Sequence, residues 1–187
     1  GKCIVLPYCI EQTEPNAAAG EIIRKRHGID ESKKILLFAG TLDYTPNANA
    51  VENIYRHLVP GLEKQGIAFR IIVCGRNNKK AFAYLNKLTH PSVIMTAEAQ
   101  DIGNYFQAAD VFINPVLSGG GIQTKTIDAL SHHCNVVCFE QMAAGIPAEV
   151  AGQKLFIAEN SNWNDFSAVV SRALLTKQPT PPAFFEY

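Results

Sequence analysis

The sequence carries a run of glycines ahead of a lysine and an aspartate, at a spacing suited to holding a diphosphate. Gly119, Gly120 and Gly121 follow an apolar stretch and precede an amphipathic segment that contains Lys125 and Asp128. Glycine lets the backbone approach a ligand closely, and the free N–H groups of a helix's first turn attract an anion. Lys125 adds a full positive charge, and Asp128 shares its helical face, where a carboxylate can accept hydrogen bonds from two ribose hydroxyls. This pattern predicts a nucleotide-diphosphate site.

A purely structural explanation of the same residues is the alternative. Glycine runs also make tight strand-to-helix turns, and a lysine and an aspartate three positions apart can form a solvated surface pair. The flanking residues favour the binding site, because 111–113 is apolar and strand-like, while Ile122, Ile127 and Leu130 give the following helix a buried side.

The composition fits one domain with a substantial core. The chain has 187 residues, of which 47% are hydrophobic. Its 17 basic and 17 acidic residues cancel, so no broad electrostatic attraction to nucleic acid or to an anionic membrane is expected. The five cysteines are an odd number, and we expect reduced thiols in a cytoplasmic protein. No apolar window reaches about 18 residues, which predicts that no segment spans a membrane.

The elements that must position this loop follow from the hydrophobic pattern. Short apolar runs alternate with helical patterns, which is typical of a parallel sheet flanked by helices. Strands are predicted at 35–39, 69–74, 93–95, 111–114, 135–139 and 155–157. Helices are predicted from Thr45 to a stop at Pro60 and at 21–27, 79–88, 104–108, 122–132 and 163–175, the last with Asn162 as its cap.

The ends of the chain differ from its middle. The residues before 33 include a strand-like stretch at 3–6 and a polar segment around Pro15, and we predict that 1–32 is an interdomain connector and the start of the domain. We predict that residues 33–176 form the main α/β domain and that 177–187 form a tail that prolines keep from being helical. The absence of an initiator methionine suggests a segment of a longer protein.

Polar loops follow four of the predicted strands at one edge of the sheet. Gly40 and Thr41 follow the first strand, Arg76 follows the second, and Thr96 and Glu98 follow the third. The glycine run follows the fourth. Ligands of open α/β sheets bind at the carboxyl ends of the strands, so we expect these loops to converge around the diphosphate.

Other polar residues have structural explanations. Asp43 could reach a substrate, but we favour a role in fixing the turn by accepting hydrogen bonds from backbone N–H groups. His132, His133 and Cys134 are adjacent and point in different directions on a helix, so we expect no metal site there. His133 stands where the helix should end, and we interpret it as a left-handed cap.

Taken together, these motifs resemble the carboxyl-terminal half of a GT-B glycosyltransferase, most like glycosyltransferase family 4 (glycosyl transferases group 1). The similarity rests on segments 40–47, 71–75, 108–115, 119–121, 125–129, 136–137 and 144–146. It implies a Rossmann-like three-layer α/β sandwich with a mainly parallel sheet, one half of a GT-B fold. It also implies that residues 33–176 bind a nucleotide-sugar.

The resemblance implies a role for each site residue. The donor's diphosphate would rest on the glycine loop, Ile122 and Lys125, and Asp128 would replace a glutamate that binds the ribose. Arg76 would lie near the phosphates or the sugar, with the loop from Thr96 to Glu98 near the base. The leaving nucleotide diphosphate would be stabilised by cations and N–H groups without a metal. Loss of Lys125 should then weaken catalysis more than folding.

The chain departs from the family's pattern in its first loop and in its glycine run. Relatives carry two glutamates eight residues apart, where this chain has Gly120 and Asp128. They also usually offer an arginine and a lysine in the first loop, where this chain has Thr41 and no nearby lysine. Lys125 is therefore the principal cation, and the base of the donor, UDP- or GDP-linked, is not decided.

The function implied is that of a hexosyltransferase in polysaccharide biosynthesis, which moves a sugar to a glycan, lipid or other acceptor with retaining chemistry. It needs no cofactor beyond the nucleotide-sugar substrate and no nucleic acid. The domain would be inactive alone, because an amino-terminal acceptor domain of the same protein is missing. We expect a cytoplasmic protein that the missing domain could bring to the inner membrane. The alternatives are a nucleotide-sugar epimerase of GT-B architecture and a non-catalytic nucleotide-binding module.

Overall fold

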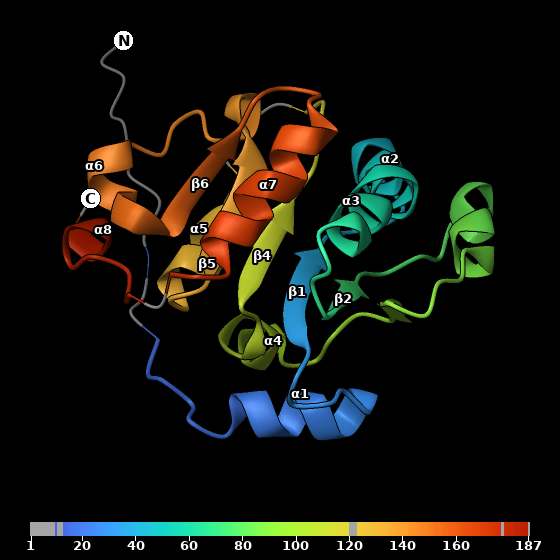
Figure 1. The fold of residues 1–187 in the computed structure, drawn as a ribbon, viewed down its shortest axis with the longest axis horizontal. Helices are drawn as coiled ribbons and strands as arrows, with labels where there is room; N and C mark the ends of the chain where they lie inside the picture. Colours follow the sequence, from blue (N-terminus) through green and yellow to red (C-terminus); the bar gives the residue numbers. More distant parts are fainter. Residues whose placement is uncertain (1–9, 11–12, 120–122, 177, 187) are drawn as a thin grey trace, which may run out of the picture.

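The computed structural model describes residues 10, 13–119, 123–176 and 178–186. Within them a six-stranded sheet has the order β3-β2-β1-β4-β5-β6 (Figure 1). All of its strand pairs are parallel. This order reverses between β1 and β4, which is the switch point of a Rossmann-like sheet. The strands are β1 (Lys34–Ala39), β2 (Phe69–Cys74), β3 (Val93–Thr96), β4 (Val111–Asn114), β5 (Asn135–Phe139) and β6 (Leu155–Ala158).

Helices cover both faces of the sheet, so the predicted three-layer α/β sandwich is confirmed. One face packs against α2 (Thr45–Asn53), α3 (Val59–Lys64) and α7 (Trp163–Ala173). The other face packs against α1 (Ala19–His27), α4 (Ile102–Ala108), α5 (Thr124–Ser131), α6 (Ala148–Ala151) and α8 (Ala183–Glu186). In the described part of the chain, none of these helices has the length and apolar character needed to cross a bilayer.

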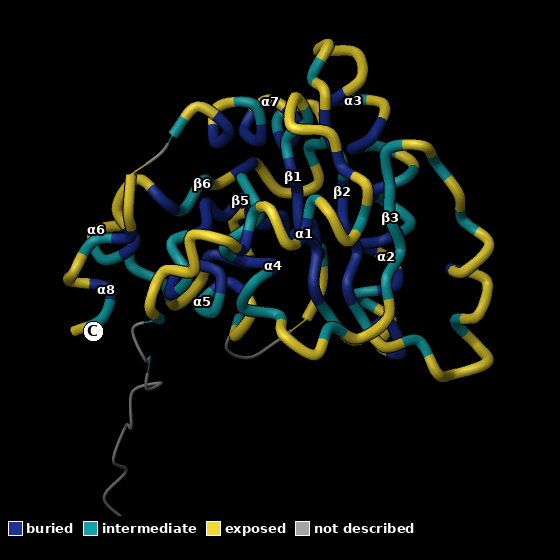
Figure 2. The backbone as a smooth tube through the Cα atoms, turned by 90° about the horizontal axis from the view of Figure 1, so that it is seen from below, coloured by how far each residue is buried: buried dark blue, intermediate teal, exposed yellow. Residues whose placement is uncertain are grey.

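Burial on both faces explains why the strands read as continuous apolar runs. In β1, Leu36 and Phe38 pack into one core while Ile35 and Leu37 pack into the other. Every residue of β4 and β5 is buried. In Figure 2 the central strands are dark, whereas the edge strand β3 has the intermediate colour. Covered parallel strands have this composition because neither side faces water. The strands predicted at 69–74, 111–114 and 135–139 have the same bounds as β2, β4 and β5 in the structure.

The predicted helix stop at Pro60 is wrong. The helical path continues through a π-helical segment, Ile54–Leu58, into α3, where Pro60 lies in the first turn. A proline inside a regular α-helix has no N–H to donate and clashes with the carbonyl four residues earlier. The wider π turn changes the hydrogen-bond register just before the proline, so the chain stays helical. The predicted helix at 79–88 is a 3₁₀ helix, Lys80–Lys87.

Two predicted helix ends are confirmed. His133 has a φ of 58°, the left-handed conformation expected after α5. The N–H of Cys134 donates to the carbonyl of Ala129, and that of His133 donates to Leu130, which is the Schellman pattern of a helix end. At α7, the Asn162 side chain accepts a hydrogen bond from the N–H of Asp165, as a cap should.

The tail packs on this domain in the part that the structure describes. The hydroxyl of Thr180 donates to the carbonyl of Leu130 at 2.6 Å, and its N–H donates to Nδ1 of His133 at 3.2 Å. Phe184 is buried, and the ring of Phe185 meets that of His133 edge-on. The prediction of a non-helical tail is wrong for Ala183–Glu186, which form the short helix α8 just after Pro181 and Pro182, because prolines stop a helix but can precede its first turn. The strand-like stretch at 3–6 lies outside the described residues.

Among the described residues, three cysteines are buried as unpaired thiols. Cys74 ends β2, Cys134 precedes β5, and Cys138 lies within β5. Burial raises the pKa of each thiol to about 12, so all three stay protonated and act as small apolar side chains.

Candidate functional site

The loops after β1 and β2 and the start of α5 meet at one edge of the sheet, as the sequence predicts. They enclose a cavity of about 160 Å³. Its walls bring together five of the predicted site residues, namely Gly40, Thr41, Arg76, Glu98 and Lys125. They come from the loops after β1, β2 and β3 and from the first turn of α5. They meet because parallel strands deliver their carboxyl ends to the same edge.

A second cavity of about 380 Å³ adjoins the first along the loops after β2 and β3. Gly75, Arg76 and Glu98 line both cavities, so the two form one groove. Thr96, a predicted site residue, lies in the second cavity. The groove is therefore long enough to offer one compartment beside Lys125 and another beside the loop after β3.

Close backbone contact fixes the floor of the groove. A Cβ atom on Gly75 would lie 2.0 Å from the carbonyl oxygen of Gly40, so only glycine fits at Gly75. The N–H of Gly40 donates to the carbonyl of Cys74, and the N–H of Leu42 donates to that of Arg76. These bonds hold the first two loops together at the edge where the strands end.

Lys125 and Asp128 form an ion pair at the start of α5. Nζ of Lys125 lies 2.8 Å from Oδ2 of Asp128, and their side chains are 46% and 30% exposed. Asp128 does not line either cavity, so it reaches the groove through Lys125. The charge of the ammonium is partly balanced here, and a bound anion would compete with Asp128 for it. An exposed pair of this kind adds only about 0.2–1 kcal/mol to stability.

The start of α5 is anchored to the sheet, and Gly119 passes close to the first loop. The Asn114 side chain, at the end of β4, donates to the hydroxyl of Thr126 at 3.3 Å, and both residues are buried. Gly119 has a φ of 145°, a conformation that favours glycine, and a Cβ there would lie 3.7 Å from the hydroxyl of Tyr44. Gly120, Gly121 and Ile122, which we predicted to hold the diphosphate, lie outside the described residues.

Asp43 has the structural role that we favoured, but it fixes the loop that follows β2 and not its own turn. Its Oδ1 accepts hydrogen bonds from the N–H groups of Asn78 at 2.8 Å and Lys79 at 2.6 Å. Its other oxygen lies 3.8 Å from the guanidinium of Arg76. The hydrogen bond from the Lys79 N–H, with those from Asn78 and the charge of Arg76, lowers the pKa of Asp43 below its ordinary 3.8 against the effect of burial.

This carboxylate should make the stability of the domain depend on pH. The folded state lowers the pKa of Asp43, so its carboxylate stabilises the fold fully at pH values above 3.8. This stabilisation is lost as the pH falls through the lower pKa that Asp43 has in the folded state. We expect Asp43→Asn to melt at a lower temperature than wild type near neutral pH, with the two converging in acid. Melting curves across pH test this, with the exposed Glu14→Gln as control. A gap that stays constant down to about pH 3 would contradict it.

Sequence reasoning missed the apolar wall of the groove. Ala99 and Ile102 line the cavity beside Lys125, and Leu42 and Met95 line the adjoining one. Leu42 and Ala99 each stand between polar residues in a loop, so hydrophobic periodicity gave no signal for them. Met95 was predicted only as part of the strand at 93–95. Among the described residues, no group of three or more His, Cys, Asp or Glu side chains is placed to hold a metal ion.

Solved structures with the same fold include glycosyltransferases. A glycosyltransferase from Rickettsia africae superposes with a TM-score of 0.64 at 14% identity, over 84% of this chain and 42% of that one. WaaG, a glycosyltransferase involved in lipopolysaccharide biosynthesis, gives 0.63 at 20% identity, over 97% and 48%. A UDP-forming α,α-trehalose-phosphate synthase from Burkholderia xenovorans gives 0.61 at 14% identity, over 86% and 40%. The chain spans less than half the length of each, which confirms the predicted fold as one half of a GT-B architecture.

The family assignment comes from the sequence itself. Comparison with curated protein sequences gives no match. The family model described as glycosyl transferases group 1 matches residues 33–176, which is most of the chain and includes every loop of the groove. The chain therefore belongs to the glycosyl transferases group 1 family.

Proposed function

We propose that this domain binds the nucleotide-diphospho-sugar donor of a glycosyltransferase, with the diphosphate beside Lys125. The observation that carries the proposal is the groove, in which Gly40, Thr41, Arg76 and Lys125 surround one compartment. Two cations and close-packed glycine backbone at the carboxyl edge of a parallel sheet suit an anionic ligand. Family membership supports sugar transfer as the reaction of the complete protein.

In the proposed complex Lys125 exchanges its partner. The diphosphate takes the ammonium from Asp128, and the released carboxylate accepts hydrogen bonds from the ribose hydroxyls. The 2.8 Å ion pair supports this exchange, because it shows that the two side chains reach the same space above the first turn of α5. The base then lies in the adjoining compartment near Thr96 and Glu98. A bound donor would thus lie along the whole groove.

The proposed chemistry is metal-independent transfer with retention at the sugar. As the sugar–phosphate bond breaks, negative charge grows on the leaving diphosphate, and a fixed ammonium stabilises that charge directly. The acceptor, a glycan or lipid, would be held by an amino-terminal domain of the same protein, in the cytoplasm or at the inner membrane. We propose a UDP-linked donor first, because a structural neighbour is a UDP-forming enzyme.

Nucleotide binding is the test of this proposal. We expect UDP at about a hundred times its dissociation constant to raise the melting temperature by about 5–10 °C. Lys125→Ala should weaken UDP binding by about 10–100-fold, because a hydrogen bond to a charged group is lost. Asp128→Ala should weaken UDP binding but not that of inorganic pyrophosphate, since pyrophosphate has no ribose. GDP and ADP, compared in the same way, identify the base.

Two outcomes would overturn the proposal. One is the absence of a melting shift with UDP, GDP, ADP and their sugars. The other is a shift that survives both Lys125→Ala and Asp128→Ala, which would place the ligand elsewhere. A normal UDP shift without sugar transfer by the complete protein would instead favour a non-catalytic nucleotide-binding module.

A further inference from the structure

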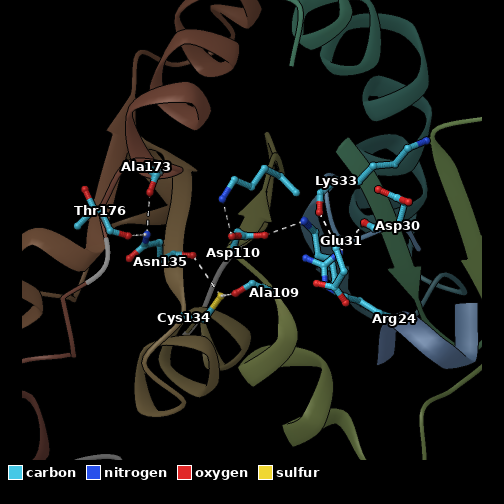
Figure 3. A network of polar contacts seen from close by, with 12 residues as sticks. Arg24, Asp30, Glu31, Lys33, Ala109, Asp110, Cys134, Asn135, Ala173 and Thr176 are labelled. Atoms are coloured by element: carbon cyan, nitrogen blue, oxygen red, sulfur yellow. Dashed lines mark hydrogen bonds and ion pairs between the residues drawn. The ribbon is translucent and has the colours of Figure 1, made fainter. Parts of the chain in front are cut away.

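A cavity of about 420 Å³ lies at the opposite edge of the sheet, where the strands begin. Asp110 precedes β4, Asn135 opens β5, and Lys154 precedes β6, and all three line this cavity. The strand register brings them together, since Val111 pairs with Asn135 and Val136 with Leu155. Figure 3 shows Asp110, Cys134 and Asn135 at this edge. The donor groove lies at the carboxyl ends of the strands, so this cavity is separate from it.

Lys154 is a buried lysine in the wall of this cavity, with 3% of its surface exposed. Within the described part of the chain, its ammonium has neither an ion-pair partner nor a hydrogen-bond acceptor. Burial lowers its pKa below the ordinary 10.5, because the charged form is poorly solvated. Lysine is almost never fully buried unless it is paired, so a site of this kind suits an anionic ligand.

Asn135 supplies a second unsatisfied group in the same wall. Its Nδ2 donates to the carbonyls of Ala173 at 2.7 Å and Thr176 at 2.8 Å (Figure 3). Two carbonyl acceptors require the amide nitrogen at that position, so the orientation of the amide is fixed by its contacts. Its Oδ1 is buried and has no partner among the described residues. The cavity therefore presents a cationic donor and a neutral acceptor.

Two titratable side chains in the wall, those of Asp110 and His133, are already engaged. The carboxylate of Asp110 accepts hydrogen bonds from the N–H of Ile35 at 2.8 Å and from Nζ of Lys34 at 3.3 Å. Nδ1 of His133 accepts from the N–H of Thr180, so a neutral His133 carries its proton on Nε2. Neither residue neutralises Lys154 in the structure.

We propose that this cavity binds a small oxyanion that also carries a hydroxyl group, either a phosphate or a hydroxy-carboxylate. The anionic oxygens accept from Lys154, and the hydroxyl donates to Oδ1 of Asn135. The volume is within the range of small-molecule sites. Thr176 and Gln178 line the same cavity, so the ligand would tie the start of the tail to the sheet.

Melting curves at constant ionic strength with inorganic phosphate, malate or sulfate test the proposal. We expect phosphate or malate at ten times its dissociation constant to raise the melting temperature by about 3–5 °C. A larger shift with phosphate indicates a phosphate ligand, and a larger shift with malate indicates a hydroxy-carboxylate. Sulfate has no hydroxyl at neutral pH and should give a smaller shift. Lys154→Met should abolish the shift and should melt higher than wild type without anion, because methionine fills the site without a buried charge.

Variants elsewhere separate this cavity from the donor groove. Lys125→Ala should keep the phosphate or malate shift, and Lys64→Met, at an exposed lysine, should behave as wild type. Amide chemical shifts of the wild-type protein should move at Asn135 and Lys154 and not at Lys125. The proposal is overturned if neither phosphate nor malate stabilises the wild type more than sulfate does. It is also overturned if Lys125→Ala removes the shift while Lys154→Met retains it.

Discussion

Replacing Gly75 by alanine is expected to destabilise the domain by about 3 kcal/mol or more and to abolish nucleotide binding. The new Cβ would lie 2.0 Å from the carbonyl oxygen of Gly40, and no side-chain rotation relieves a contact with backbone. The two loops would have to separate, which breaks the hydrogen bonds from Gly40 to Cys74 and from Leu42 to Arg76. Urea denaturation gives the loss of stability, and the UDP melting shift gives the loss of binding.

Gly20→Ala is the matched control. It adds the same methyl group inside α1, where nothing lies within 4 Å of the new Cβ. Alanine is the better helix former, so this variant should be more stable than wild type by about 0.5–1 kcal/mol. Suppose instead that the free energy of unfolding of Gly75→Ala lies within 1 kcal/mol of wild type and that the variant still binds UDP. The two loops can then move apart freely, and the proposed floor of the groove is wrong.

Much of the fold could be predicted because the sheet is covered on both faces. A strand buried on both sides is a short continuous apolar run, and Phe69–Cys74 and Asn135–Phe139 show it clearly. The path around Pro60 could not be predicted, because proline normally ends a helix. Whether a π turn forms instead depends on how the helix packs against the rest of the molecule.

The convergence of the loops was also predictable, since it follows from parallel strands. The partners of individual side chains were not. Asp128 faces Lys125 as its spacing suggests, but only the structure shows that the two are paired. Lys154, between a glutamine and a leucine, looks like an ordinary surface lysine in the sequence. The cavity that it lines also includes residues before β4, at the start of β5 and in the tail, which the sequence alone does not bring together.

Removal of the Lys125 ammonium is expected to reduce the rate of sugar transfer about 10²–10³-fold in the complete enzyme. Under the proposed mechanism this ammonium is the principal cation beside the leaving diphosphate, where negative charge grows in the transition state. An interaction that strengthens in the transition state lowers kcat as well as kcat/KM when it is lost. Steady-state kinetics with the UDP-sugar, on a protein that includes the acceptor domain, measures both constants.

Lys125→Ala should have little effect on the stability of the fold. The pair with Asp128 is partly exposed, so Lys125→Ala should unfold within about 1 kcal/mol of wild type. Lys125→Arg keeps the charge and should recover part of the rate, while Lys64→Ala, which removes an exposed lysine, should leave the rate unchanged. The opposite outcome is a kcat for Lys125→Ala within threefold of wild type, with only KM raised. Uniform binding of the donor and the transition state changes KM alone, so this result would show that Lys125 binds the donor without stabilising the departing charge.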